Sequence, residues 1–461
     1  MIMTLSLLPI TIVPIKTFQN NKNRIKISHS LIHYWNADIN KPLYIKAGAH
    51  IFETIIEEGF ITKDEIFICE GLLQDLLLPV EERNFLAHFD RHSNTLTLGP
   101  IFGLLTEINE NNETADTPHF RSIHKFCEEL DQLTSDIGGF FYVFRLQDFS
   151  DDGIYGYYFQ DGGWIKTQVP FPDVIYNRIH SRKLDSSKHF QVLKTKLLAK
   201  NIHLFNDQFL SKEKVANLLK EEDYLRPYLP ETASLTENTL REMINRYPVL
   251  FLKPIHGSQG RNIIKLSSQN NGLLAELSTG SIKERGIEFS GFQPFFQWLQ
   301  PFLKKRTYLV QQGIPLIKYK NNQLDFRILC QRNSHNSWKA TSGVARVSAN
   351  DQFVANIARG GQMIKPLRVL TSLSNRENAM QQLSLMKELA IEIASIISQK
   401  SDGLVGELGI DIGLDENGKP WIIEVNSKPS KNFEEETSKI RPSAKALLEY
   451  VIFLTFSGGN Q

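Results

Sequence analysis

One segment near the C-terminal end constrains the fold of this chain more than any other. Residues 407–414 alternate between apolar side chains and polar or small ones, and residues 420–426 form a second, mainly apolar run. A period of two is typical of a β-strand with one buried face. Between the runs lies Asn417-Gly418, the kind of pair that favours a two-residue type I′ turn. The sequence therefore predicts an antiparallel β-hairpin over 407–426.

The predicted hairpin brings two acidic residues together. A two-residue turn places Asp411 directly opposite Glu424, with Cβ atoms about 4.5–5.5 Å apart. Carboxylates this close repel each other unless a cation lies between them or one is protonated. Asn426 projects from the same face and adds an amide oxygen, so the three side chains suit magnesium or manganese. Two alternatives stay open: a longer turn would place Asp411 diagonally to Glu424, and a solvent-facing hairpin would leave both acids in water.

A second hairpin carries a lysine and a glycine-rich loop. Residues 249–254 resemble a buried strand that ends in Lys253-Pro254, and residues 262–266 resemble the returning strand. Glycines let main-chain N–H groups approach an anion closely, and a lysine adds positive charge for phosphates. The loop is not a Walker A motif, because no Gly-Lys-Ser/Thr and no helix follow. An ordinary hairpin with a solvated lysine is the alternative. The predicted phosphate-binding residues are Lys253, Gly257, Ser258, Gln259 and Gly260.

The composition argues against several functional classes. With 52 Lys and Arg against 51 Asp and Glu in 461 residues, no overall field attracts nucleic acid or an anionic membrane. The three cysteines, Cys69, Cys127 and Cys330, fit neither a disulfide framework nor a zinc site, which indicates a reducing, cytoplasmic compartment. The apolar start lacks a basic region and a cleavage site, so we expect a buried strand there rather than a signal peptide. No apolar run is long enough to span a bilayer, and we expect a soluble protein.

The chain is expected to form three units of mixed α/β (α+β) class. Residues 1–92 combine short apolar runs with polar turns, which predicts a small β-rich domain. Residues 93–200 predict an α/β domain, because a strand from Thr95 is followed by a helix around 118–133 and another strand. Residues 201–461 hold the motifs described above.

Three local features are predicted in the last unit. Ser211 is expected to cap the start of a helix. A second helix is expected over 375–399, with Ser374 and Glu377 spaced as a capping box. The polar stretch 265–290 is expected to be a surface loop.

The order of these motifs resembles the ATP-grasp superfamily across about 201–461. A strand-end Lys-Pro, a Gly-Ser-Gln-Gly loop and a closing Asp…Glu-x-Asn hairpin carry the resemblance. It implies two lobes that enclose ATP and magnesium, preceded by a pre-ATP-grasp domain. It also implies Lys212 as a first nucleotide lysine, a hinge strand whose main chain near Val310 and Gln312 reads the adenine, and two arginines that meet phosphates. The residues implied are Lys212, Val310, Gln311, Gln312, Arg327 and Arg346.

A closer resemblance is to the YheC/YheD endospore coat-associated family, over most of the chain after about residue 95. It implies a spore-forming source and a connection with the spore coat. This sequence departs from many ATP-grasp ligases at Gln311-Gln312, where an acidic residue often lies, and at Ser430, where a glycine is common. The motifs that carry this resemblance are Tyr176–Ile179, Leu204–Asn206, Phe209–Lys212, Tyr228–Thr232, Asp325–Arg327, Asn356 with Gly360-Gly361, and Glu424–Pro429.

The resemblance implies an ATP- and magnesium-dependent ligase. Such an enzyme would join the carboxylate of a small molecule or peptide to an amine or another nucleophile, such as a thiol, through an acyl phosphate. Arg327 and Arg346 would be catalytic, although a salt bridge to a neighbour such as Asp325 is the alternative for both. Arg178 is a further candidate for the cleft. Two other functions stay open: a small-molecule kinase, and a non-catalytic nucleotide-binding scaffold with spore coat proteins as partners.

Overall fold

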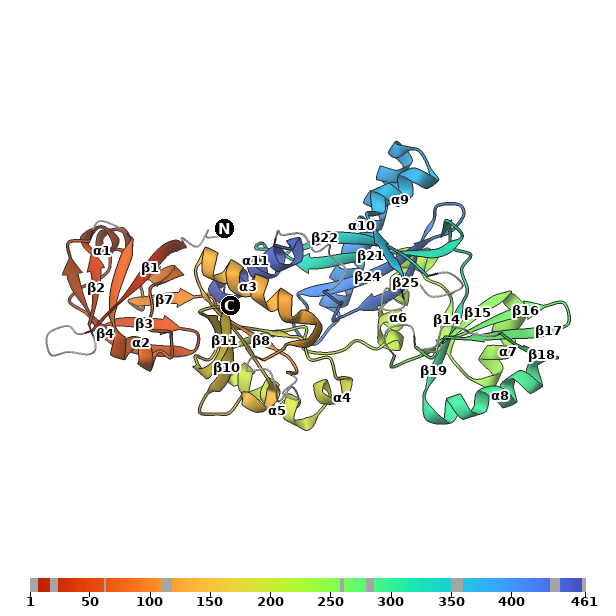
Figure 1. Ribbon diagram of the computed structural model, residues 1–461, viewed down its shortest axis with the longest axis horizontal. Coiled ribbons are helices and arrows are strands. Elements are labelled where there is room, and N and C mark those ends of the chain that lie inside the picture. The colour runs from red at the N-terminus through yellow and green to blue at the C-terminus, as the bar shows by residue number, and fades with distance from the viewer. Residues whose placement is uncertain are drawn as a thin grey trace.

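The computed structural model describes residues 7–16, 24–61, 64–108, 118–257, 261–278, 286–349, 360–431 and 440–457. Four sheets follow one another along the longest axis of the molecule, from a β-barrel at one end to a small sheet at the other (Figure 1). Helices and strands are mixed throughout, as the α/β (α+β) prediction requires. None of the helices in these ranges is both long and apolar enough to cross a membrane.

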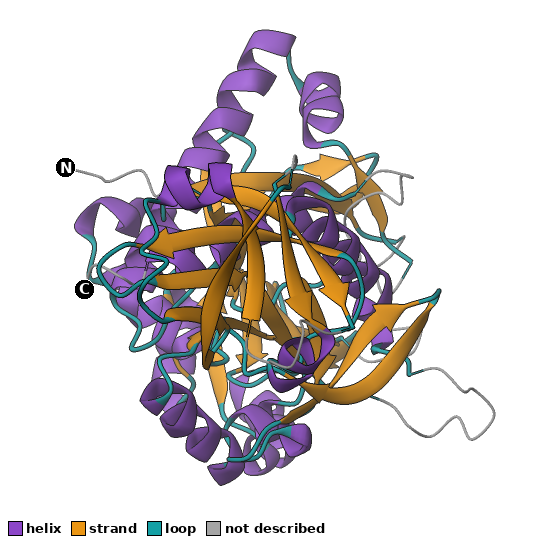
Figure 2. Ribbon diagram, turned by 90° about the vertical axis from the view of Figure 1, so that its left-hand side faces the viewer, coloured by secondary structure: helices purple, strands orange, loops and turns teal. Residues whose placement is uncertain are grey.

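The first sheet is a closed barrel, and its end of the molecule faces the viewer in Figure 2. Its strand order is β1-β5-β2-β4-β3-β7-β6, and β1 closes it by pairing with β6. The strands contribute alternating apolar side chains to the interior, which confirms the β-rich prediction for this region. The elements are β1 Leu8–Ile15, β2 Arg24–Ser28, α1 His29–Trp35, β3 Leu43–Ala47, β4 His50–Gly59, β5 Glu65–Cys69, α2 Glu70–Asp75, β6 Arg83–Asp90 and β7 Thr95–Gly99.

The second sheet has the order β11-β10-β9-β8-β12-β13, and β8, β9, β12 and β13 are parallel. Helix α5 packs on one face, while α3 and the C-terminal helix α11 cover the other. The strand from Thr95, expected to open this unit, instead pairs with β3 and β6 of the barrel, and the second sheet begins at Ile101. The elements are β8 Ile101–Leu105, α3 His124–Ile137, β9 Phe140–Phe144, β10 Ile154–Gln160, β11 Gly163–Val169, β12 Val174–Asn177, α4 Arg182–Asp185, α5 Lys188–Ala199, β13 His203–Phe205 and α11 Pro442–Ser457.

The third sheet, which we call the small lobe, has the order β14-β19-β15-β16-β17-β18 and is covered by α7 and α8. The predicted hairpin from 249 is present as β15 and β16. The expectation of a surface loop over 265–290 is wrong, because β16, β17 and β18 pair there and bury Leu266, Leu273 and Ala275. The elements are β14 Thr232–Ser234, α7 Glu237–Arg246, β15 Val249–Pro254, β16 Ile264–Gln269, β17 Gly272–Leu277, β18 Ile287–Phe289, α8 Phe292–Lys305 and β19 Tyr308–Gln312.

The fourth sheet, which we call the large lobe, has the order β23-β22-β21-β24-β25, and α10 packs on one of its faces. Ser211 caps α6 as predicted, since its hydroxyl accepts from the N–H of Lys214. The predicted cap of α10 is wrong by one residue: Asn375 caps the helix, and Ser374 ends α9. The elements are α6 Lys212–Lys220, β20 Lys318–Tyr319, β21 Asn322–Arg332, β22 Trp338–Val347, β23 Gln362–Ile364, α9 Pro366–Leu373, α10 Arg376–Gln399, β24 Glu407–Leu414 and β25 Pro420–Asn426.

Candidate functional site

A pocket lies where the small lobe faces the large lobe. Strands β14, β15 and β19 supply one wall, while α6 and β25 supply the other. Most of the lining is apolar, and a few charged and polar groups converge on it, which is the usual composition of a small-molecule site. The charged and polar lining residues are Lys212, Lys220, Thr232, Lys253, Gln311 and Glu424.

The predicted pairing of the two acids is present, but the turn that produces it differs from the prediction. Asp411 of β24 lies opposite Glu424 of β25. The turn has three loop residues rather than two, closed by the N–H of Asp415 donating to Lys419 O at 3.0 Å, and Gly418 alone has positive φ, at 77°. This longer turn shifts the pairing by one residue, and a β-bulge between Asp411 and Ile412 shifts it back.

Asp411 is buried between two arginines. It accepts from Arg327 in a two-pronged ion pair, and Arg346 approaches within 2.9 Å. Arg346 also binds both oxygens of Asp325, at 2.6 and 2.7 Å. Burial opposes ionisation of Asp411, but the two arginines lower its pKa to about 2. Cross-strand pairing of β21 with β22 and β24 sets this arrangement, so the salt bridges considered for both arginines are present.

Glu424 is paired with a lysine from a different element. Lys212, the first residue of α6, donates to Glu424 at 2.5 Å. A lysine is unfavourable at a helix N-terminus, and this carboxylate compensates for it. Burial opposes ionisation of Glu424, yet Lys212 lowers its pKa below the usual value. Helix α6 and the hairpin therefore carry opposite charges into the same pocket.

Lys253 reaches this pocket from the small lobe. Its ammonium donates to Gln311 Oε1 at 2.5 Å, and Gln311 in turn donates to Thr232 Oγ1 at 3.0 Å. Burial lowers the pKa of Lys253 from 10.5 to about 8; Glu424 opposes that shift and Lys212 adds to it. Lys253 is thus in electrostatic contact with both charged groups of the opposite wall, although it lies 171 positions before Glu424 in the chain.

The hinge strand β19 is paired on both sides within the small lobe, and Gly257 is the one residue of the predicted glycine loop in the described ranges. Val310 is paired on both sides, with Ala233 and Leu252, and the N–H of Gln312 donates to Glu231 O at 2.8 Å. These main-chain groups are thus engaged within the sheet, and adenine recognition there stays a prediction. Gly257 follows β15 as expected. Ser258, Gln259, Gly260 and Asn356 lie outside the described residues.

A magnesium ion fits the chemistry of the predicted trio. The amide Nδ2 of Asn426 lies 3.4 Å from Asp411 Oδ2, so all three side chains share one face of the hairpin. The two carboxylates and the amide of Asn426 offer oxygen atoms as metal ligands, and hard cations prefer such ligands. Across the described part of the chain, no three Asp, Glu, His or Cys side chains form a metal-binding group. The residues that would hold the ion are Asp411, Glu424 and Asn426, and their role stays a prediction.

The sequence interpretation missed a buried cluster at the start of β24. Glu407 is fully buried and accepts from Tyr176 at 2.6 Å, from Gln331 at 2.8 Å and from Lys431. Arg178, considered for the cleft, lies 3.8 Å from Glu407 instead. The cluster joins β12 of the second sheet to the large lobe. The only signal for it was the position of Glu407 in the same alternating run as Asp411.

The chain is similar to several known proteins. YheD of Bacillus subtilis (strain 168), an endospore coat-associated protein, is 27% identical over 372 residues, which cover 80% of each chain. YheC of the same organism is 23% identical over 315 residues, 66% of this chain and 85% of YheC. Among solved structures, the D-alanine-D-alanine ligase of Coxiella burnetii matches with 11% identity and a TM-score of 0.44, over 77% of this chain and 95% of the ligase. The YheC/D-like ATP-grasp family model matches residues 201–454. The chain therefore belongs to the YheC/D-like ATP-grasp family.

Proposed function

We propose that this protein is an ATP-dependent ligase that joins a carboxylate to an amine or another nucleophile. The observation that carries the proposal is the convergence of Lys212, Lys253 and Glu424 on one pocket from both lobes. Two lysines provide charge for a nucleotide triphosphate, and the apolar lining provides a surface for the base. Family membership supports ATP as the nucleotide.

The reaction would proceed in two steps. A substrate carboxylate oxygen would attack the γ-phosphorus, and the bond from that phosphorus to the β–γ bridging oxygen would break. The products of this step are ADP and an acyl phosphate. The nucleophile then attacks the acyl carbon, loses a proton and expels inorganic phosphate. Lys212 and Lys253 would hold the phosphates, and Arg327 and Arg346 would stabilise the charge on the transferred group. Magnesium bound by Asp411, Glu424 and Asn426 would neutralise charge on the phosphate oxygens.

A non-catalytic scaffold is the second candidate, and one observation favours it. Asp411 and Glu424 are already neutralised by Arg327, Arg346 and Lys212, so the folded chain has no electrostatic need for a metal. In that case the nucleotide pocket would serve folding or assembly with spore coat proteins. The names of the two relatives support a spore coat association for either candidate.

The deciding experiment measures ATP binding and ADP release by the full chain. We expect micromolar to millimolar binding that requires magnesium, and ADP release stimulated by an extract that contains the acceptor. Glu424→Ala should abolish the magnesium dependence and ADP release, while Glu416→Ala, in the exposed turn of the same hairpin, should change neither. Absence of nucleotide binding at millimolar ATP would refute both candidates; binding without turnover in any extract would favour the scaffold.

A further inference from the structure

The second sheet has the topology that forms ligand crevices in open parallel sheets. After β8 the chain passes through α3 to β9, and after β12 it passes through α5 to β13 on the opposite face. The direction of winding therefore reverses between the neighbouring strands β8 and β12. In sheets of this kind, ligands bind outside the carboxyl ends of the strands at the reversal point. Here those ends are Leu105 and Asn177.

Hydrogen bonds fix the chain at this point. Glu107 Oε2 accepts from the N–H groups of His180 and Ser181, each at 2.9 Å. Thr106 donates to Arg178 O at 3.2 Å, and the N–H of Arg178 donates to Leu105 O at 2.7 Å. The segment that follows β12 is therefore held over the end of β8, together with its basic side chains.

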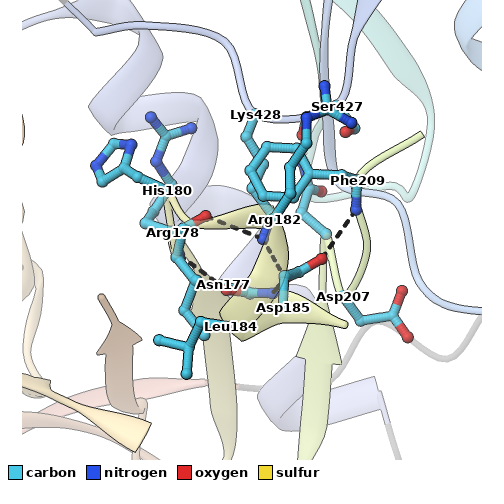
Figure 3. A network of polar contacts seen from close by, with 12 residues as sticks. Asn177, Arg178, His180, Arg182, Leu184, Asp185, Asp207, Phe209, Ser427 and Lys428 are labelled. Carbon is cyan, nitrogen blue, oxygen red and sulfur yellow. Dashed lines mark hydrogen bonds and ion pairs between the residues drawn. The ribbon is translucent and has the colours of Figure 1, made fainter. Parts of the chain in front are cut away.

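The large lobe contributes a further cation to the same place (Figure 3). Lys428 donates to Asp185 at 2.6 Å and lies 4.4 Å from the ring centre of Phe209; Arg182 lies 4.6 Å from the same ring centre. Asp185 also accepts from Asn177 at 2.9 Å and from the N–H of Phe209 at 3.0 Å. Its charge is thus satisfied by three donors and leaves little repulsion for an incoming anion.

Two arginines at this point keep hydrogen-bond donors that no acid occupies. Arg178 is 2% exposed and lies 3.8 Å from Glu407, but within the described residues its Nε has no hydrogen-bond partner. Arg182 has no acid at ion-pair distance in the same part of the chain, where its neighbour is the ring of Phe209. Burial, Arg178, Arg121 and Lys428 together lower the pKa of His180 to about 4, against the effect of Glu107. The positive potential at the His180 ring therefore has contributions from Arg178, Arg121 and Lys428.

This group of three cations and the His180 ring, which we call the switch-point cluster (Arg178, His180, Arg182 and Lys428), is continuous with the proposed nucleotide site. Lys428 follows Asn426 by two residues, and two residues of extended chain span at most about 7 Å. Glu424 also counteracts the lowering of the pKa of Arg182 by burial. A group bound at the cluster would therefore lie beside the metal-binding face of β25.

We propose that the switch-point cluster binds an oxyanion, a carboxylate or a phosphate, on the acceptor substrate. The acceptor would then be an acidic compound that carries a negative group in addition to the carboxylate that is activated. Arginine provides paired donors that match either oxyanion, and a half-buried site strengthens the interaction. Only the assignment of the bound anion to the ligase's carboxylate substrate rests on the proposed function. Anion binding at the cluster itself needs no ATP.

The test uses the full chain without nucleotide at constant ionic strength. Histidine ring signals are followed by NMR during separate titrations with succinate, inorganic phosphate and sodium chloride, and the His180 signal is assigned with His180→Gln. We expect a saturable shift of the His180 signal with succinate or phosphate and none with chloride. Response to succinate alone identifies a carboxylate, response to phosphate alone identifies a phosphate, and response to both supports the shared oxyanion chemistry.

Matched variants on α4 separate specific binding from general charge effects. Arg182→Gln should weaken the response about tenfold or more, whereas Lys183→Gln, the exposed neighbour on the same helix, should keep the wild-type affinity. No saturable shift with either anion, or an equal loss in both variants, would overturn the inference. A chain that binds succinate but not ATP would refute the proposed ligase and support this anion site. A chain that binds ATP but neither succinate nor phosphate would refute this site and leave the proposed ligase standing.

Discussion

Asp411 lies opposite Glu424 because a β-bulge compensates for a turn that is one residue longer than the Asn-Gly pair suggests. The two acids therefore share one face of the large lobe with Arg327, and α6 brings Lys212 to the same face.

The first prediction concerns the turn itself. Gly418 has φ of 77°, a conformation that costs a residue with a side chain about 1–2 kcal/mol. Gly418→Ala should lower the free energy of unfolding by that amount in urea titrations followed by circular dichroism. Gly163→Ala is the control, because no positive φ is recorded there and the nearest atom to the added Cβ lies 4.0 Å away. Equal effects of the two substitutions would contradict the turn.

The second prediction concerns the charge of Lys253. Its pKa is about 8, so the free protein loses this positive charge as the pH rises through that value. ATP affinity, measured by calorimetry between pH 7 and 9, should therefore fall with rising pH. Lys253→Met should bind weakly and show a flatter pH profile. If the variant keeps the decline of the wild type, another group causes it.

The third prediction concerns the buried ion pair of Asp411. Arg327→Met leaves a buried carboxylate with one partner fewer, and breaking such a pair costs about 3–5 kcal/mol. The free energy of unfolding should fall accordingly. Arg246→Met removes an exposed pair with Glu231 and should cost at most about 1 kcal/mol. Similar losses in both variants would show that Asp411 is not held as described.

The fourth prediction concerns the contact between the second sheet and the large lobe. Tyr176→Phe removes a donor from buried Glu407, which should cost about 1–3 kcal/mol and increase proteolysis between the two units. The control is Tyr155→Phe, because Tyr155 is 54% exposed. An unchanged protease pattern in Tyr176→Phe would mean that this hydrogen bond does not hold the units together.

Local patterns predicted the elements that carry the site. Periodicity indicated β15, β24 and β25, and the Ser211 cap marked the start of α6, because each depends on neighbouring residues alone. Such local patterns did not predict how strands distant in the sequence pair with one another. Within 265–290, the described residues form strands because β16 to β18 extend the small-lobe sheet, although the polar residues of this stretch resemble a loop. The capping residue of α10 was missed by one position, since Ser374 and Asn375 are both good caps.

The sequence by itself determined the acids, the lysines and their order along the chain, and through that order the family. Only the tertiary structure decided which charges meet: Lys212 with Glu424, Arg327 with Asp411, and Lys428 with Asp185. The physical reason is that local periodicity fixes the face on which a side chain lies, whereas its partner depends on sheet register and on how separate units pack. Those depend on contacts between residues up to hundreds of positions apart, which no local pattern records.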